Sequence, residues 1–267
     1  MIQTTEVDLK VLNSLTKYPS IPTYHGMADR GMLLPEHVVF DNDVLYASEK
    51  VDGTNSRIIL MPDNRYIIGS REELLYANGD LIVNPTLGIV EAIRDIAKIV
   101  HQHQLWTWTN SAGDLEIGDI PKIIRVFYFE MYGGKTPESK HYSGSGKTHC
   151  RLFDVCDVGV EMLEMPIEKI SGWRENGGQN YLRHDALIGL ADKIGLDLTP
   201  RITIESIPSS IDETYAWLKN VIPASLSKID NGGAGKPEGI VVRTRTRSTI
   251  AKLRFEDYER YFKKYRN

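Results

Sequence analysis

The polar run of residues 48–55, Ser-Glu-Lys-Val-Asp-Gly-Thr-Asn, constrains the fold of this chain more than any other stretch. Strand-like segments precede it at residues 44–47 and follow it at residues 57–60, so Lys50 is predicted to lie at a strand-to-strand junction. Gly53 lets the backbone approach a ligand closely, which suits attack of a lysine on a phosphate. Because the ordinary pKa of lysine is about 10.4, such a nucleophile needs burial or cationic neighbours. The alternative is an ordinary turn with an exposed lysine.

Four further segments carry charged or aromatic residues inside apolar, strand-like sequence. Glu130 lies within an aromatic strand, and Phe153 is the centre of a short apolar strand. Glu238 opens a third strand, while Lys252 and Arg254 alternate and therefore share one face of a fourth. Together with the lysine of the first motif, the order along the chain is Lys, Glu, Phe, Glu and Lys-x-Arg. Five such motifs in order are far more informative than any one of them.

This series resembles motifs I, III, IIIa, IV and V of the covalent nucleotidyltransferases, which include polynucleotide ligases and mRNA capping enzymes. The resemblance predicts one catalytic domain over residues 35–267, with residues 1–34 as an N-terminal extension packed on it. It implies an α+β fold similar to ligase catalytic and ATP-grasp-like domains. Two mostly antiparallel β-sheets, flanked by helices, are expected to enclose a nucleotide cleft, without an OB-fold domain.

Details of the motifs look like the phage RNA-ligase-2-like group of ATP-dependent RNA ligases. Asn55 stands where DNA ligases usually have arginine, and the turn at 132–134 and the Ser/Gly loop at 143–146 also resemble this group. Asp52 departs from the histidine of some members. Arg254 departs from the second lysine of many members, but it keeps the positive charge and adds a fork for phosphate.

The resemblance implies that the ε-amine of Lys50 attacks the α-phosphate of ATP, forms lysyl-AMP and releases pyrophosphate. Lys252 and Arg254 are expected to favour the free amine and to hold the α-phosphate, and Glu238 completes the expected catalytic set. Glu238 and Asp52 are expected to bind Mg²⁺ or Mn²⁺, because such hard ions prefer carboxylate and phosphate oxygens.

A partly overlapping set of residues is expected to bind the nucleotide. Its members are Glu49, Lys50, Asn55, Arg71, Glu130, Phe153 and Lys252. Glu130 and Asn55 are expected to contact the sugar or to orient the lysine. Phe153 is expected to stack on adenine, with core packing as the alternative. Arg71 is expected to contact the ribose or a 5′-phosphate, with a surface ion pair to a neighbouring glutamate as the alternative.

The sequence therefore predicts an ATP-dependent RNA ligase that joins 3′-hydroxyl and 5′-phosphate ends through an adenylylated 5′ end. A DNA or general nick ligase is the first alternative. A capping guanylyltransferase is disfavoured because the chain after Lys252 is too short for an OB-fold, and a non-catalytic RNA-binding protein would not need the full motif set. RNA ends or a nicked duplex are the expected partners, the chain is expected to be a monomer, and an accessory protein could replace a missing C-terminal helical domain.

The composition is that of an ordinary globular protein, with 41% hydrophobic and 25% charged residues. No apolar run approaches the ~20 residues of a membrane span, and the first residues lack the basic start of a signal peptide. Cys150 and Cys156 make neither a disulfide framework nor a four-ligand zinc site. We therefore expect a cytoplasmic protein with free thiols. If a phage encodes the chain, the cytoplasm is that of the host.

The net charge of −4 is unevenly distributed. Basic residues predominate after residue 242, and the alternation of Arg243, Arg245 and Arg247 predicts three arginines on one strand face. Such a surface favours phosphate binding. The alternative is a solvated terminal helix over residues 255–265.

Periodicity predicts helices over residues 85–103, 181–194 and 211–221, with Gly195 as the C-cap of the second. Strands are predicted between them, and the loop at 230–236 is predicted to be a mobile element over the site. Residues 144–148, Gly-Ser-Gly-Lys-Thr, look like the end of a phosphate-binding loop. His141 occupies the place of its first glycine and a strand follows instead of a helix, so that interpretation is set aside.

Overall fold

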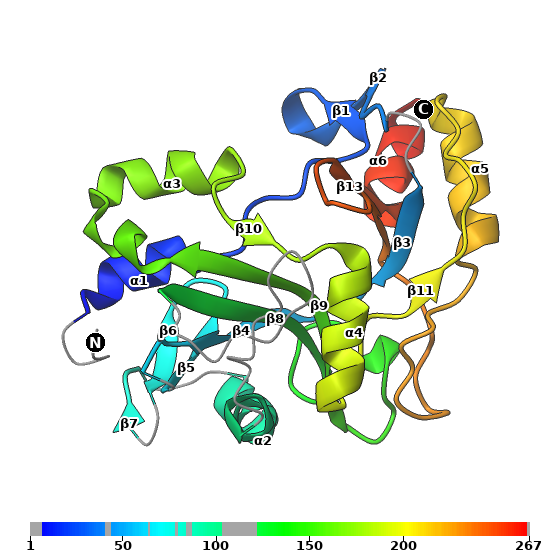
Figure 1. The fold of residues 1–267 in the computed structure, drawn as a ribbon. Helices are drawn as coiled ribbons and strands as arrows, with labels where there is room; N and C mark the ends of the chain where they lie inside the picture. The colour runs from blue at the N-terminus through cyan, green and yellow to red at the C-terminus, as the bar shows by residue number, and fades with distance from the viewer. Residues whose placement is uncertain are drawn as a thin grey trace.

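The computed structural model describes residues 7–40, 44–63, 65–77, 80–83, 87–102 and 122–265. Within them, two antiparallel sheets of seven and four strands form the framework, and a two-stranded hairpin lies beside the smaller one (Figure 1). Helices cover both faces of the larger sheet and the outer face of the smaller one. This is the predicted α+β arrangement. None of the described helices combines the length and apolar character needed to cross a bilayer.

The larger sheet is built around two long, apolar strands, β8 and β9. Its order is β10 (Asn180–Tyr181), β9 (Thr148–Gly159), β8 (Ile123–Gly133), β4 (Thr54–Leu60), β5 (Tyr66–Ser70), β6 (Leu74–Ala77) and β7 (Asp80–Leu81). Helices α2 (Ile89–Gln102) and α4 (His184–Ile194) pack on one face, and α1 (Leu9–Leu15) and α3 (Ile167–Glu175) cover the other. Because both faces are covered, most side chains of β8 are buried.

The smaller sheet has the order β11 (Arg201–Ile202), β3 (Leu45–Lys50), β12 (Gly239–Thr244) and β13 (Ile250–Arg254). Helices α5 (Ile211–Val221) and α6 (Phe255–Tyr265) pack on its outer face. Along β3 the side chains alternate, so that Ala47 and Glu49 are buried while Ser48 and Lys50 are partly exposed. This alternation turns Lys50 toward the space between the two sheets.

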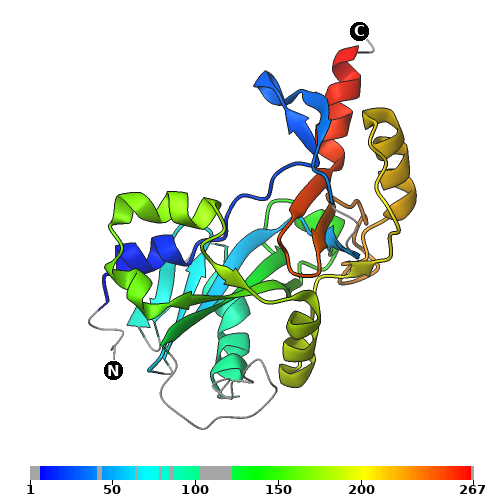
Figure 2. The same ribbon diagram turned by 45° about the horizontal axis from the view of Figure 1, so that its top comes forward.

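The remaining regular segments are short. The hairpin consists of β1 (His25–Met27) and β2 (Leu33–His37), and 3₁₀ turns occur at Asp29–Gly31, Ser139–His141 and Val160–Glu164. Residues 16–24 connect α1 to β1 and cross from the larger sheet to the edge of the smaller one (Figures 1 and 2). There Lys252 N donates to Pro22 O and Tyr24 N donates to Lys252 O, both at 2.9 Å. The N-terminal segment thus completes the edge at β13.

Local signals explain several boundaries. Asp8 caps α1 by accepting from Lys10 N at 2.8 Å. Gly195, at a φ of 68°, ends α4 as predicted. The predicted helix over 181–194 starts too early, because Asn180 and Tyr181 pair with β9. The predicted helix over 211–221 and the terminal helix over 255–265 are confirmed. The ends of the predicted helix over 85–103 lie outside the described residues.

Candidate active site

A cleft of about 560 Å³ lies between the two sheets. Strands of both sheets, the start of α4 and residues 18–21 of the N-terminal segment line it. Every residue that the sequence motifs predicted lines the cleft, but the carboxylate of Glu49 faces away from it. The residues are Glu49, Lys50, Asp52, Asn55, Arg71, Glu130, Phe153, Glu238, Lys252 and Arg254. The register of the smaller sheet explains part of this convergence, since Lys50 at the end of β3 pairs with Gly239, the residue after Glu238.

Lys50 and Glu238 line the cleft and form an ion pair there. The Nζ of Lys50 lies 2.5 Å from Oε2 of Glu238, and both side chains are largely buried. Burial raises the pKa of Glu238, and the carboxylate of Asp52 raises it further, while Lys50 opposes both effects. Any other partner of the Lys50 Nζ therefore has to compete with the Glu238 carboxylate.

Lys252 and Arg254 lie beside this pair on β13. Burial lowers the pKa of Lys252, and the positive charges of Arg254 and Lys50 lower it further. Arg254 has a partner that the motifs did not reveal. Its Nε and Nη2 donate to the two carboxylate oxygens of Asp257 at 2.9 and 2.7 Å. Asp257 thus fixes the arginine fork at the start of α6 and offsets part of its charge.

Glu130 and Asn55 face each other across the β4–β8 pairing. Burial raises the pKa of Glu130 to about 8, helped by the nearby carboxylates of Glu238 and Asp52 and opposed by Lys50. Asn55 Oδ1 is buried and has no hydrogen-bond partner among the described residues. A neutral carboxyl group can donate a hydrogen bond to a hydroxyl oxygen, and the unpaired amide oxygen beside it can accept one from a hydroxyl group.

Phe153 and Arg71 both line the cleft, as expected of residues that contact the nucleotide, and both also make the contacts expected from the alternative interpretations. The Phe153 ring lines the cleft and also packs edge-on against Tyr18 at a centroid distance of 5.0 Å. Arg71 lines the cleft, and its Nε lies 3.5 Å from Oε1 of Glu72. Its side chain is 76% exposed, so this surface pair holds it only weakly.

Glu49 has a structural role that the motif did not indicate. Its carboxylate accepts from Ser225 Oγ at 2.5 Å, Leu226 N at 2.9 Å and Ser227 Oγ at 2.8 Å. Strand alternation directs this carboxylate to the face of β3 opposite Lys50. Glu49 therefore anchors the segment after α5 to the strand that carries the lysine.

The carboxylates of the cleft do not form a preassembled metal cage. No group of three His, Cys, Asp or Glu side chains in the described part of the chain is close enough to hold an ion. Glu238 and Asp52 both line the cleft beside cationic residues. Two carboxylates fit the usual coordination of Mg²⁺, which takes one or two protein carboxylates and completes its shell with water and substrate phosphates.

The prediction of three arginines on one strand face is wrong. Strand β12 ends at Thr244, so only Arg243 lies on it. Arg243 Nη1 and Arg247 Nε donate to the two carboxylate oxygens of Asp154, at 3.0 and 2.7 Å, while the exposed Arg245 pairs with Asp185. Because Asp154 belongs to β9 and both buried arginines to the β12–β13 hairpin, the cluster joins the two sheets.

The loop at 230–236, predicted to be mobile, is held by hydrogen bonds. The Asp230 carboxylate accepts from Ser143 Oγ and Ser145 Oγ at 2.6 Å and from Gly144 N at 2.9 Å. These donors lower its pKa. Thr148 begins β9, so the Gly-Ser-Gly-Lys-Thr segment leads into a strand, as the rejection of a phosphate-binding loop required.

Comparisons with known proteins concern the family and the fold of the chain. A sequence model of the family described as RNA ligase matches residues 43–264. A search of curated proteins found no match. Among solved structures, a mutant of Naegleria gruberi RNA ligase with ATP and Mn is 14% identical, with a TM-score of 0.54 over 95% of this chain and 63% of that chain. An archaeal ATP-dependent RNA ligase is 16% identical, with a TM-score of 0.51 over 91% of this chain and 49% of that one. The chain thus spans less than two thirds of these proteins, and the likeness concerns the fold.

Proposed function

Because the chain belongs to the RNA ligase family, we propose that it is an ATP-dependent RNA ligase that joins a 3′-hydroxyl to a 5′-phosphate end. The observation that carries the proposal is one cleft in which a lysine, two further cations and three acidic residues converge from both sheets. In this proposal residues 35–267 form the catalytic domain and residues 1–34 are its N-terminal extension.

The cleft suits ATP in size and in chemistry. Its volume of about 560 Å³ is within the range of small-molecule sites. Phe153 and Val241 offer apolar surface from opposite sheets for the base. The unpaired Oδ1 of Asn55 can accept a hydrogen bond from a sugar hydroxyl group. Glu130, whose pKa is raised, can donate one to a sugar hydroxyl group when it is protonated.

Lys50 is the proposed nucleophile. Its deprotonated Nζ forms a bond to the α-phosphorus of ATP, the bond from that phosphorus to the bridging oxygen breaks, and pyrophosphate leaves with the electron pair. The nitrogen then loses a further proton and remains as a phosphoramidate. Lys252 offsets the negative charge that builds on the α-phosphate. A divalent cation held by Glu238 and Asp52 would screen the triphosphate and compete with Lys50 for the Glu238 carboxylate.

Two further transfers complete the proposed reaction. A 5′-phosphate of RNA attacks the lysyl-AMP phosphorus and releases the lysine, which gives an adenylylated 5′ end. The 3′-hydroxyl then attacks the 5′-phosphate, and AMP leaves as the new phosphodiester forms. The RNA ends are the proposed partners.

Incubation with α-labelled ATP and Mg²⁺ or Mn²⁺ tests the first transfer. We expect a labelled protein band that acid removes, and Lys50→Ala should abolish it while the thermal unfolding temperature stays close to that of the unmodified protein. Lys140→Ala, which changes an exposed lysine outside the cleft, should label normally. Label from GTP instead of ATP would indicate capping. No label from either nucleotide would favour an RNA-binding protein without ligase activity.

Substrate preference tests the RNA assignment separately. Nicked duplexes that differ only in the sugars near the 3′-hydroxyl should be sealed faster with ribose than with deoxyribose, because the 2′-hydroxyl distinguishes the two. Equal rates would leave a general polynucleotide ligase.

A further inference from the structure

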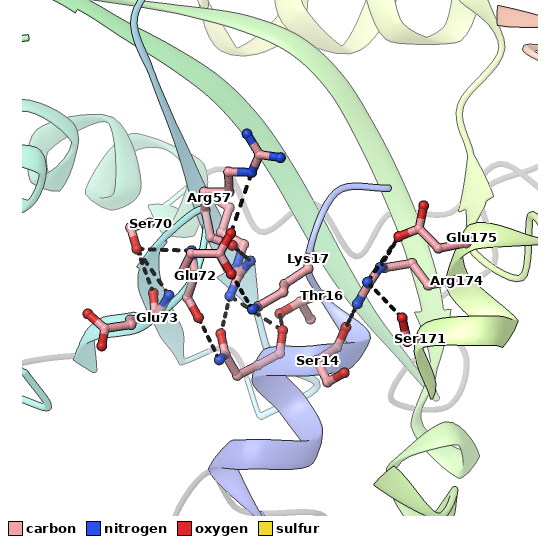
Figure 3. Close-up of polar contacts among 12 residues, drawn as sticks. Ser14, Thr16, Lys17, Arg57, Ser70, Glu72, Glu73, Ser171, Arg174 and Glu175 are labelled. Atoms are coloured by element: carbon pink, nitrogen blue, oxygen red, sulfur yellow. Dashed lines mark hydrogen bonds and ion pairs between the residues drawn. The ribbon is translucent and has the colours of Figure 1, made fainter. Parts of the chain in front are cut away.

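Arg71 belongs to a turn formed by residues 70–73. A helix outside the part of the chain that the family model matches holds this turn in place. Helix α1 precedes residue 43, where that match begins. Asn13 on α1 uses both ends of its side-chain amide. Its Nδ2 donates to Glu72 O at 2.9 Å, and its Oδ1 accepts from Arg57 Nη2. Figure 3 shows Lys17, Arg57 and Glu72 gathered at this point beside α1.

Arg57 connects this helix to the backbone of Arg71 itself. The residue is fully buried on β4, and its Nη1 donates to Arg71 O at 3.4 Å. Its Nη2 reaches both the side chain and the backbone oxygen of Asn13. Burial lowers the pKa of Arg57 to about 10, so it remains charged at neutral pH. A buried charge is costly unless it is hydrogen-bonded, so Arg57 depends on these oxygens.

A second set of contacts closes the turn. Ser70 Oγ accepts from Glu72 N at 3.2 Å and from Glu73 N at 3.0 Å. On its outer side, Glu72 pairs through one oxygen with Lys17 at 2.6 Å and through the other with Arg71 at 3.5 Å. The turn is thus fixed from inside by Asn13 and Arg57 and from outside by Lys17.

We propose that Asn13 and Arg57 are positioning residues, through which α1 fixes the turn and directs Arg71 into the cleft. Arg71 is mostly exposed and only weakly held by Glu72, so the position of its backbone in the turn sets the region that its guanidinium group can reach. A displacement of about 1 Å in a substrate-positioning group can cost on the order of 100-fold in rate. This positioning rests on the proposed function, because it assigns Arg71 a part in binding the nucleotide or the 5′-phosphate.

The competing explanation is that these hydrogen bonds only stabilise α1. Asp8 offers a matched control, because it caps the same helix through Lys10 N and Val11 N and contacts no residue of the turn. Asp8→Ala should weaken α1 and leave the Asn13 contacts in place. Asn13→Ala should free the turn. A difference between the two variants therefore reports on the turn and not on the helix.

The experiment is a double-mutant cycle on Asn13 and Arg71. Lysyl-AMP formation and AMP transfer to a 5′-phosphorylated RNA are measured for the unmodified protein, Arg71→Ala, Asn13→Ala, the double variant and Asp8→Ala. We expect Arg71→Ala to slow one of the two steps, and Asn13→Ala to slow the same step by about 10- to 100-fold. In the double variant the Asn13 change should add nothing, because the group that it positions is absent.

Three results would overturn the positioning role. One is an Asn13 effect that multiplies with the Arg71 effect, another is an Asn13→Ala rate equal to that of Asp8→Ala, and the third is an Arg71→Ala variant without a defect. If even the unmodified protein forms no lysyl-AMP, the proposed function fails. Amide hydrogen exchange at residues 70–73 then decides the inference alone. It should accelerate in Asn13→Ala and not in Asp8→Ala, and unchanged exchange would refute the positioning.

Discussion

Replacing Asp154 with alanine removes the carboxylate on which Arg243 and Arg247 converge. Asp154 is 1% exposed, and the two arginine side chains are 8% and 9% exposed. The Tyr18 hydroxyl, which donates to Asp154 at 2.8 Å, loses its acceptor as well. The variant would therefore leave two guanidinium groups between the sheets without their counterion.

The expected cost follows from this burial. Removing one partner of a buried ion pair destabilises a protein by about 3–5 kcal/mol, because the remaining charge is neither solvated nor compensated. For a chain of this size, each kcal/mol lowers the unfolding temperature by roughly 2–4 °C, so we expect a fall of about 6–20 °C. The loss should be largest in the contact between the sheets, because β9 and the β12–β13 hairpin meet there.

Urea and thermal unfolding measure the effect, with Asp185→Ala as the matched control. Asp185 pairs with Arg245, and both side chains are more than half exposed. Such a surface pair contributes little to stability, because water and salt screen it. If Asp154→Ala unfolds at the same urea concentration as Asp185→Ala, the buried cluster does not join the sheets energetically and the reasoning is wrong.

Two further predictions concern the cleft. The folded-state pKa of Glu130 is raised to about 8 from an ordinary 4.5. The stability that its proton contributes is therefore complete below pH 4.5 and lost as pH rises through 8. In Glu130→Gln, urea unfolding at pH 5 and pH 9 should show less of this loss, and an identical pH dependence would contradict the raised pKa. Gly239, at a φ of 155°, has no room for a Cβ, which would overlap Leu253 O. Thermal unfolding should show a cost above about 3 kcal/mol for Gly239→Ala, against about 1–2 kcal/mol for Gly146→Ala, whose Cβ would meet nothing. Equal costs would refute the overlap.

The sequence indicated which residues line the cleft because most of the motif residues lie on strands or next to strand ends. Alternation decides which side a strand residue faces, and Lys252 and Arg254 therefore share a side without any knowledge of the fold. The order of the motifs along the chain gave the resemblance that assigned them to one shared site. The paired strands β3 and β12 bring Lys50 and Glu238 together, although 188 residues separate them.

Alternation gave a wrong prediction where the strand ends before the alternating sequence pattern does. Arg243, Arg245 and Arg247 continue the period of β12, but the chain turns after Thr244 to begin the hairpin. The polar run that follows Thr244 was the available signal for this turn. Arg247 then adopts a φ of 62°, which no strand residue would have.

The hydrogen-bond partners of the site residues could not be predicted from the sequence for another reason. Asn13, Asp154 and Asp257 act through contacts that tertiary packing creates, and no local pattern distinguishes them from other polar residues. Helix α1 was missed for a related cause, since its seven residues bury only three side chains and give a weak period.

The docking of residues 16–24 on the edge of the smaller sheet also determines when the protein can finish folding. Tyr18 of this segment contacts Arg247 across 229 residues of sequence, and the neighbouring His25 of β1 contacts Tyr258 of α6 across 233. During synthesis the N-terminal segment leaves the ribosome early, while the hairpin and helix that receive it emerge late. Closing so long a loop is entropically costly and slows folding. The wall that this segment adds to the cleft should therefore form last, after both sheets are complete.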